Sequence, residues 1–370
     1  MAENWQEVSP ISFPHVQELQ PRILIIAIRA IGDVVLISPL LPVLKKTYPS
    51  GYLAVLVDGP TAEVLANNPS IDRFMPINRS GSQGETCWKR GKNLVHLVRD
   101  IRNERFDVVI DVFSGPRSAI LSYLSGASER YGEDFRNRGR GFLYNHPIKI
   151  CRDGRHLIEQ KMDLVNALLG EKGLQGGTLE LFLAEKERQQ GQHLLGETRH
   201  GQIRRIGLIP NAGSIWRVWP AERFAELADC LIQKFGVEVI LLGGGNDVEV
   251  CSKICSLMKE KPRDLSGKTT LRELMAVLVE LDLVISNVTG PMHLAVGLSQ
   301  PKVIGLYGAA DTVQYAPWGT YGTMLTKGST QDAYWNKVDY RQDYEILCQI
   351  TVEDVFQTVK SVMTEWSACP

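Results

Sequence analysis

The sequence predicts an α/β protein with two parallel, doubly wound sheets. Apolar runs of strand length recur along its 370 residues, and segments with helical spacing separate them. These runs are continuously hydrophobic, which is typical of strands that helices cover on both faces. The expected strands are residues 23–29, 52–57, 106–112, 205–209, 237–242, 281–286 and 302–307. Because strands and helices alternate, each sheet should be parallel.

The segments between these strands have the apolar periodicity of amphipathic helices. Their apolar side chains recur at three- and four-residue spacing, so each helix can cover a sheet with one face. The expected helices are residues 34–47, 61–67, 94–102, 118–124, 156–169, 221–235, 247–258 and 270–279.

A polar stretch, residues 184–202, separates the strands into two groups. It has no strand pattern, so we place the junction between two domains there. The first domain is expected to span residues 1–190 and the second residues 203–345. Residues 351–370 should form a terminal helix, because a Thr cap precedes apolar residues that share one face. We expect this helix to pack back across the junction.

The composition is that of an ordinary two-domain globular protein. Hydrophobic residues make up 44% of the chain, enough for two cores, and the formal net charge is -1. This balance excludes a global attraction to nucleic acid or to an anionic bilayer. Residues 1–22 contain no apolar segment of a secretory signal, and no apolar run approaches the ~20 residues that cross a bilayer. We therefore expect a cytoplasmic protein.

The seven cysteines are scattered and never form Cys-x-x-Cys, so reduced thiols are expected. Cys251 and Cys255 share a helix face by their spacing, but no histidine or further cysteine lies near them in the sequence. The sequence therefore predicts inert thiols rather than a zinc site, and no metal ligands are assigned.

Chemistry in such a protein is expected in loops that follow strands, facing a cleft between the domains. The first such loop, residues 29–35, contains Gly32, which permits a tight turn, and Asp33 at the start of the next helix. Taken alone, Asp33 is better explained as a helix N-cap. No strand is followed by G-x-G-x-x-G, so a nicotinamide dinucleotide site is not supported.

The second loop, residues 210–224, follows the first strand of the second domain and could hold a phosphate. Asn211, Gly213 and Ser214 offer backbone and side-chain donors, and Arg217 adds a positive charge. A surface loop whose two tryptophans merely cover the sheet explains the same residues equally well.

The third loop, residues 286–298, joins a strand to a helix that begins near Thr289 and Gly290. A helix start presents free N–H groups to an anion, so this turn suits a diphosphate. His293, one turn into the helix, could donate to the same oxygens. A histidine satisfied inside the core is an equally good explanation.

A glycine cluster, residues 241–247, also lies between a strand and a helix. Its Gly243 and Gly244 would allow the close approach of a ligand to the backbone. The geometry of an ordinary turn explains the cluster nearly as well, because glycine clusters alone carry little specificity.

Taken together, these segments resemble glycosyltransferase family 9, the heptosyltransferases of lipopolysaccharide core assembly. The likeness extends from about Arg22 to about Gly319, and its specificity lies in the order and spacing of five segments. These are residues 28–49, 211–227, 239–247, 286–298 and 303–319. The resemblance implies a GT-B fold, in which two Rossmann-like domains face a cleft, with an N-terminal acceptor domain and a C-terminal nucleotide-sugar domain.

The resemblance also implies a reaction, the inverting transfer of a sugar from a nucleotide-sugar donor, typically ADP-heptose, without a metal or other cofactor. The acceptor would be a lipopolysaccharide-type or other glycan, anchored in lipid at the cytoplasmic side of the inner membrane. Peripheral contact with that membrane is therefore expected, and nucleic acid is not expected as a partner. A diverged, non-catalytic nucleotide-sugar-binding protein of the same fold is the alternative.

By this resemblance Asp33 is the general base that takes the proton of the acceptor hydroxyl. The donor is expected to be bound by residues from three segments of the second domain. They are Asn211, Gly213, Ser214, Arg217, Gly243, Gly244, Val288, Thr289, Gly290 and His293.

Two positions depart from the family pattern. Arg217 stands where the family usually has Lys. The positive charge is kept, but a planar guanidinium replaces a compact ammonium. Val288 stands where the family usually has an Asp that is expected to meet sugar hydroxyls, and valine cannot accept a hydrogen bond. A different donor sugar is our first explanation. A weak or inactive relative, or a compensating polar group such as Asp311, are the others.

Residues 129–155 are dense in Arg and Lys and interleaved with Tyr and Phe. In an acceptor domain such a segment predicts a loop that meets phosphates or acidic sugars of a lipid carrier, with Arg136, Arg138 and Arg140 as candidate contacts. A solvated loop without a partner is the alternative, and no RNA-binding signature accompanies the basic residues.

Overall fold

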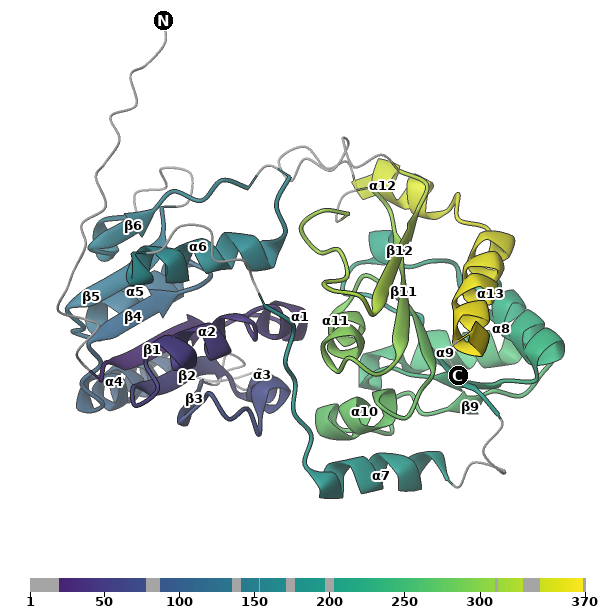
Figure 1. The fold of residues 1–370 in the computed structure, drawn as a ribbon, viewed down its shortest axis with the longest axis horizontal. Helices are drawn as coiled ribbons and strands as arrows, with labels where there is room; N and C mark the ends of the chain where they lie inside the picture. Colours follow the sequence, from purple (N-terminus) through teal and green to yellow (C-terminus); the bar gives the residue numbers. More distant parts are fainter. Residues whose placement is uncertain are drawn as a thin grey trace, which may run out of the picture.

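The computed structural model of the protein describes residues 20–77, 87–134, 141–152, 154–170, 177–196, 203–309, 312–328 and 340–368. Two six-stranded sheets dominate this part of the chain, and helices pack around both of them (Figure 1). All described strand pairs are parallel. The predicted α/β class with two doubly wound sheets is confirmed.

The first sheet has the strand order β3-β2-β1-β4-β5-β6. Its strands are β1 (Arg22–Ala27), β2 (Tyr52–Asp58), β3 (Arg73–Ile77), β4 (Val108–Asp111), β5 (Glu129–Glu133) and β6 (His146–Ile148). Its helices are α1 (Ile31–Val35), α2 (Leu40–Thr47), α3 (Gly59–Ala62), η1 (Glu63–Leu65), α4 (Cys87–Asn103), α5 (Pro116–Leu124), η3 (Gly141–Leu143) and α6 (Leu157–Leu169). We call this unit the N-terminal lobe.

The second sheet has the strand order β12-β11-β10-β7-β8-β9. Its strands are β7 (Arg205–Ile209), β8 (Glu238–Leu241), β9 (Arg263–Asp264), β10 (Leu283–Asn287), β11 (Lys302–Tyr307) and β12 (Gly322–Thr326). Its helices are α7 (Glu185–Leu195), η4 (Ile215–Arg217), α8 (Ala221–Phe235), η5 (Gly245–Asp247), α9 (Val248–Leu257), α10 (Leu271–Leu278), α11 (Gly290–Gly297), α12 (Tyr340–Leu347) and α13 (Val352–Ala368). We call this unit the C-terminal lobe.

The seven strands predicted from the sequence are the inner strands of the two sheets. Along β1, Ile23 and Ile25 lie in one core cluster and Leu24 and Ile26 in another, so both faces are buried. This explains the continuous hydrophobicity of the strand. The strands that the prediction missed, β3, β5, β6, β9 and β12, lie toward the sheet edges and are short or carry polar side chains.

The single helix predicted for residues 34–47 is two helices, α1 and α2. Pro39 occupies the N-cap position of α2. Because proline has no N–H to donate to the preceding turn, one helix cannot continue through it undisturbed. The break leaves α1 as a short helix that points its start away from the core of the N-terminal lobe, toward α11 (Figure 1).

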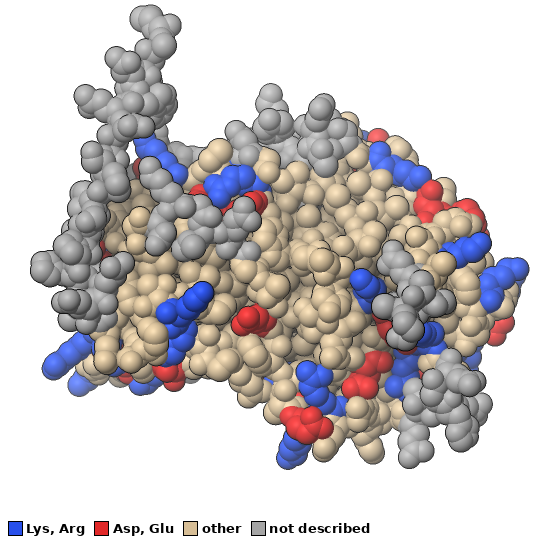
Figure 2. Space-filling view, in the orientation of Figure 1, with Lys and Arg blue, Asp and Glu red and all other residues tan. Residues whose placement is uncertain are grey.

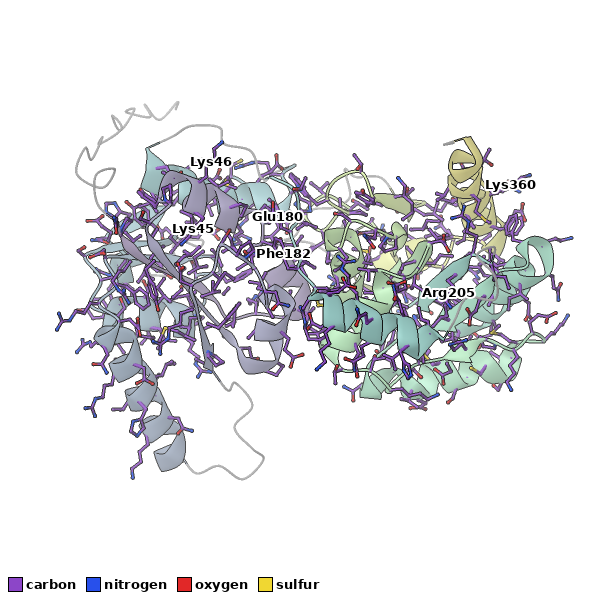
Figure 3. All side chains as sticks on the ribbon, turned by 60° about the horizontal axis from the view of Figure 1, so that its bottom comes forward. Lys45, Lys46, Glu180, Phe182, Arg205 and Lys360 are labelled. Atoms are coloured by element: carbon purple, nitrogen blue, oxygen red, sulfur yellow. The ribbon has the colours of Figure 1, made fainter. Side chains whose placement is uncertain are left out.

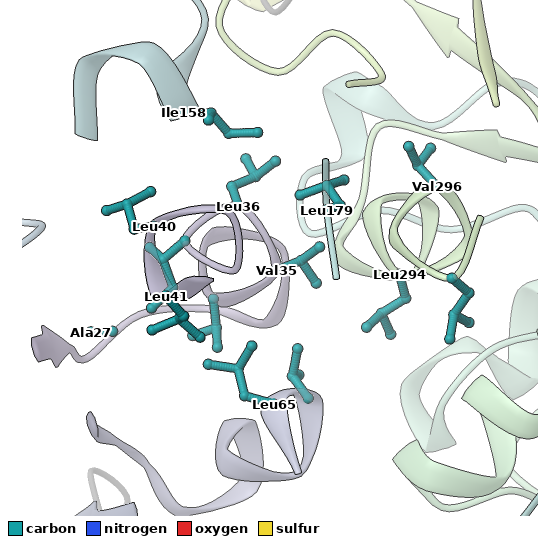
Figure 4. Close-up of a cluster of buried hydrophobic side chains, with 14 of the residues drawn as sticks. Ala27, Val35, Leu36, Leu40, Leu41, Leu65, Ile158, Leu179, Leu294 and Val296 are labelled. Atoms are coloured by element: carbon teal, nitrogen blue, oxygen red, sulfur yellow. The ribbon is translucent and has the colours of Figure 1, made fainter. Parts of the chain in front are cut away.

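The two lobes share one apolar cluster. Val35 and Leu36, at the end of α1, lie near Leu179 of the connecting segment, and Leu294 and Val296 of α11 belong to the same cluster (Figure 4). All five side chains are buried. Since burial of a large aliphatic side chain contributes about 1.5–3 kcal/mol, this cluster holds α1 and α11 together.

Within the stretch taken as the junction, residues 185–195 form α7. This helix packs on α10 so closely that a Cβ atom on Gly191 would collide with the carbonyl oxygen of Ala276. The proposed domain boundaries stay a prediction. Helix α13 packs on α8, where the rings of Phe235 and Phe356 stack at 5.2 Å. These contacts lie within the C-terminal lobe, and packing of the terminal helix across the junction stays a prediction.

Arg272 of α10 links the C-terminal lobe to the connecting segment and to the N-terminal lobe. It donates to both carboxylate oxygens of Glu187, at 2.7 and 2.6 Å, and to the carbonyl oxygens of Phe182 and Glu63, at 2.8 and 2.9 Å. Figure 3 shows Phe182 on the segment between the lobes. A bidentate guanidinium of this kind fixes orientation as well as contact.

Charged side chains are sparse in the middle of the face shown in Figure 2, where the lobes meet, and more frequent toward its ends. This distribution agrees with the apolar contact between the lobes. Within the described ranges, no helix has the length and apolar character that spanning a membrane requires.

Candidate functional site

The candidate loops lie where the order of the strands reverses. In the first sheet β1 lies between β2 and β4, and in the second β7 lies between β8 and β10. Ligands of doubly wound proteins bind outside the carboxyl ends of strands at such a switch point. The chain places Asp33 after β1, residues 210–220 after β7 and residues 288–293 after β10.

The lobes touch at the starts of α1 and α11. A Cβ atom added to Gly32 would lie 3.1 Å from Cδ2 of His293 and 3.3 Å from Cα of Gly290. One added to Gly290 would lie 3.1 Å from Cβ of Ile31 and 3.2 Å from the backbone nitrogen of Gly32. Since even a methyl group would be crowded, the two helix starts are in direct backbone contact. Asp33 and the turn at Gly290 are therefore neighbours across the lobe boundary.

Asp33 lies in the first turn of α1, with 11% of its side chain exposed. The N-cap position belongs to Ala30, so Asp33 is not the N-cap residue that its sequence position suggested. Its Oδ2 lies 3.3 Å from Nε of Arg29. Burial raises the pKa of the Asp33 carboxyl, while Arg29, Lys161 and a hydrogen bond with the Ala30 backbone lower it. A carboxylate in this environment is suited to accept a proton.

His293 is 3% exposed, and its Nδ1 has no hydrogen-bond partner among the described residues. Burial, with a smaller effect of His156, lowers its pKa to about 3, so the ring is neutral at physiological pH. A histidine satisfied inside the core does not account for the unpartnered nitrogen. The neutral ring can donate or accept one hydrogen bond with a ligand, but it supplies no positive charge.

The turn before α11 combines an uncommitted hydroxyl with an apolar side chain. Thr289 occupies the N-cap position, but its side chain makes no capping hydrogen bond. Val288 is 8% exposed and belongs to the same apolar cluster as Met292 and Tyr307. Val288 therefore packs as a core residue, whereas the hydroxyl of Thr289 is not used by its own helix.

The glycine cluster is tied to the second loop through Asp247. The Nδ2 of Asn211 donates to Oδ1 of Asp247 at 2.5 Å, and the N–H of Gly244 donates to Oδ2 at 2.7 Å. A Cβ atom on Gly243 would lie 2.5 Å from Cβ of Asp247. Asp247 fills the space beside Gly243 and accepts the hydrogen bond of the Gly244 N–H. These contacts favour an ordinary turn, rather than a ligand site, as the reason for the glycine cluster.

The second loop is held in place by contacts on both sides of η4. Ser214 caps η4, with Oγ accepting from the N–H of Trp216 at 3.4 Å. Arg217 ends η4 and is partly buried. The ring of Trp216 lies edge-on to that of Tyr344, 6.0 Å away. By contrast, no atom lies within 4 Å of a Cβ atom built on Gly213, so packing in the described structure does not require glycine there.

Asn287 joins the second and third loops and was not singled out from the sequence. It is fully buried; its Oδ1 accepts from the N–H of Trp219 at 3.1 Å, and its Nδ2 donates to the carbonyl of Pro210 at 2.7 Å. The available signal was an amide side chain directly after the predicted strand of residues 281–286. Asn287 fixes the loop after β7 beside the start of α11.

The three acceptor-binding candidates, Arg136, Arg138 and Arg140, lie outside the described residues. Two other arginines of the basic segment serve internal contacts. Arg152 forms an ion pair with Glu133, at 2.5 Å, and Arg155 with Asp163, at 2.6 Å. The high density of basic residues in this segment is therefore partly structural.

A group of charged side chains that the sequence prediction missed lies beside Asp33. Lys161 of α6 is 3% exposed, and the carboxylates of Asp111 and Glu133, at the ends of β4 and β5, influence its charge. Asp111 itself is fully buried and accepts from the hydroxyl of Tyr144 at 2.7 Å. A lysine within the apolar face of the predicted helix 156–169 was the available signal.

The thiols and potential metal ligands give no sign of a metal centre in the described part of the chain. Cys251 and Cys255 are free, and burial raises the pKa of the Cys251 thiol to about 12. No group of three or more His, Cys, Asp or Glu residues in the described ranges is arranged to bind a metal. Independence of a metal stays a prediction.

Comparison with known families decides what kind of protein carries this site. A profile of glycosyltransferase family 9 (heptosyltransferase) matches residues 94–343, well over half of the chain. The chain belongs to glycosyltransferase family 9. This family 9 glycosyltransferase is 26% identical over 353 residues to lipopolysaccharide heptosyltransferase 3 of Escherichia coli K12, and the alignment covers 90% of this chain and 96% of that one.

Solved structures resemble this glycosyltransferase over nearly its whole length. A family 9 glycosyltransferase from Veillonella parvula has a TM-score of 0.79 at 24% identity, covering 93% of this chain and 97% of that one. The ADP-heptose lipopolysaccharide heptosyltransferase II of E. coli has a TM-score of 0.77 at 19% identity, covering 94% and 99%. These likenesses confirm the GT-B fold, and family membership does not favour the non-catalytic alternative.

Proposed function

We propose that this glycosyltransferase moves a heptose or related sugar from a nucleoside diphosphate to a lipopolysaccharide-type acceptor, with inversion and without a metal. The observation that carries the proposal is the contact between α1 and α11, in which Gly32, the residue before Asp33, lies against Gly290 and His293 of the other lobe. The names of the relatives, lipopolysaccharide heptosyltransferases, support the choice of sugar and acceptor class.

In the proposed reaction Asp33 accepts the proton of an acceptor hydroxyl while that oxygen attacks the anomeric carbon. The bond between this carbon and the diphosphate oxygen breaks, and the nucleoside diphosphate leaves as an anion. Attack from the side opposite the leaving group inverts the configuration. A positioned general base contributes roughly 10²–10⁴-fold to such a step, because a neutral alcohol is a poor nucleophile.

The leaving diphosphate is assigned to the start of α11 and to η4. The N-terminal end of a helix favours negative charge, and the hydroxyl of Thr289 is not used in capping. Ser214 and Arg217 would add a hydroxyl and a guanidinium from the second loop. His293, neutral in this site, would contribute one hydrogen bond through a ring nitrogen.

The donor can be identified by thermal unfolding of the wild type and of Val288→Asp with ADP-heptose, other nucleotide sugars, free sugars and NAD. A cognate nucleotide sugar at ~100 times its Kd should stabilise the protein by about 2.7 kcal/mol, whereas free sugars and NAD should not. Because Val288 replaces an expected acceptor of sugar hydroxyls, Val288→Asp should change the order of preference among donors. Equal turnover of ADP-heptose by both proteins would show that residue 288 does not set the donor.

Peripheral membrane contact is assigned to the outer helices of the N-terminal lobe. Helix α4 projects from that lobe (Figure 3), and Val95 on it is 67% exposed. Ile120 of the neighbouring helix α5 is 46% exposed, and Arg99 and Arg117 lie on the same two helices. Exposed apolar groups among cations suit the surface of an anionic bilayer.

Sedimentation with anionic lipid vesicles tests this contact. We expect Val95→Glu to reduce the bound fraction several-fold, because it places a carboxylate where an apolar group would enter the lipid surface. Val248→Glu makes the same change at an exposed position of α9 in the other lobe and should bind like the wild type. Equal binding of all three proteins would refute the assignment of α4 to the membrane.

A further inference from the structure

Lys161 is a charged residue that the proposed reaction does not yet use. It lies on α6 with 3% of its surface exposed. Its ammonium lies 4.9 Å from the centre of the Phe113 ring, and the guanidinium of Arg29 lies 5.4 Å from the same ring. Arg29 in turn contacts Asp33. The two cations thus lie over one aromatic ring, and the candidate base contacts one of them.

Three carboxylates from neighbouring strands accompany the buried ammonium. Asp33 follows β1, Asp111 ends β4 and Glu133 ends β5, and these strands are adjacent in the sheet. The pKa of Lys161 is lowered to about 8, chiefly by burial and also by Arg152, while Glu133, Asp111 and Asp33 act to raise it. Isolated burial of an ammonium would cost several kcal/mol, so these carboxylates are what keep Lys161 charged.

Two of the three carboxylates have other strong partners. Glu133 receives a bidentate guanidinium from Arg152, with contacts of 2.5 and 2.6 Å to its two oxygens. Asp111 accepts from the backbone N–H of Ser114 at 2.8 Å and from the hydroxyl of Tyr144 at 2.7 Å.

Asp33 has fewer other strong partners than Asp111 and Glu133. Its cationic neighbours are Arg29 and Lys161, and the side chain of Arg29 is 50% exposed. Solvent and salt screen an exposed charge far more than a buried one. The ammonium of Lys161 is therefore the unscreened positive charge near the base.

We propose that Lys161 is a positioning residue of the transfer reaction, whose buried ammonium keeps Asp33 in its charged, proton-accepting form. This inference rests on the proposed role of Asp33 as base. Lys161 does not have to touch the substrate, because it acts through the carboxylate. The neutral ring of His293, which contacts Gly32 from the other lobe, adds no charge that could replace it.

The direction of the pH effect follows from the charges. Without Lys161, Asp33 loses a cation that favours its ionised form, and the negative charges of Asp111 and Glu133 are left less compensated. Both changes raise the pKa of Asp33. The acid limb of kcat/KM, where the base becomes protonated, should therefore move to higher pH.

The test is the pH profile of kcat/KM for the wild type, Lys161→Met, Lys161→Arg and Met162→Ala. In Lys161→Met we expect the acid limb to move up by about one pH unit or more, which is roughly a tenfold loss at any pH on that limb. Lys161→Arg keeps the charge and should restore most of the limb. Met162 is a fully buried apolar neighbour, so Met162→Ala controls for loss of stability and should leave the limb in place.

The inference would be overturned if Lys161→Met lowered kcat/KM by the same factor at every pH and left the acid limb in place. If that variant does not fold, the wild type still provides a test, because the acid limb should shift little between low and high salt when a buried cation sets it. A limb that moves strongly with salt would assign the effect to the exposed Arg29 instead. Retained turnover in Asp33→Asn would defeat the proposed function itself, which is a separate outcome.

Discussion

Asp33→Asn should lower kcat by about 10²–10⁴-fold while leaving donor binding nearly unchanged. Asparagine has the shape of aspartate but cannot take a proton, and the donor contacts are assigned to the other lobe. Single-turnover rates measure the transfer step, and thermal unfolding with the nucleotide sugar measures binding. Turnover close to that of the wild type would remove Asp33 from the mechanism.

Asp72→Asn is the matched control for this substitution. Asp72 belongs to the N-terminal lobe, where its Oδ2 accepts from Nζ of Lys45 at 2.9 Å and from the N–H of Leu53 at 2.7 Å. Leu53 lies near the beginning of β2, whereas Asp33 follows the end of β1. Asp72→Asn therefore changes the same chemical group at the opposite end of the sheet, and kcat should remain near that of the wild type.

Gly32→Val should lower kcat/KM by about 100-fold or more, because a displacement of about 1 Å at a reacting centre has effects of this size. A side chain at residue 32 would collide with His293 and with the backbone of Gly290, at 3.1 and 3.3 Å from Cβ alone. The start of α1 would have to move away from α11, and Asp33 would move with it. Steady-state kinetics with saturating donor measures the loss.

The control for this prediction is Gly91→Val in α4, where no atom lies within 4 Å of an added Cβ. Both variants add the same side chain within a helix, but only one is at the contact between the lobes. If Gly32→Val kept the kcat/KM of Gly91→Val, the close approach of α1 and α11 would have no bearing on catalysis.

The inner framework of the fold could be predicted from the sequence because its strands are buried on both faces. After a basic first residue, the strands β1, β7 and β11 carry no charged side chain, so each can be recognised from its own residues alone. Strand β5, with the sequence ERYGE, lies between β4 and β6 and gains these partners only from the assembled sheet. The residues of β5 alone therefore do not show that it is a strand.

The candidate site was predictable in part, for a similar reason. Asp33 and Gly290 each follow a strand, and the topology of parallel sheets places such loops at one edge. Lys161 could not be placed, because its importance depends on Asp111 and Glu133, which reach it only through the fold. The need for glycine at residue 32 likewise arises from the other lobe.

The most direct test of the proposed site is a crystal structure of Asp33→Asn with an intact nucleotide sugar and an acceptor analogue. We predict that the diphosphate lies at the start of α11, within reach of Thr289 and Gly290, and that the anomeric carbon faces residue 33 across the acceptor hydroxyl. A diphosphate bound away from α11, or an anomeric carbon turned away from residue 33, would contradict the assignment of Asp33 as the base.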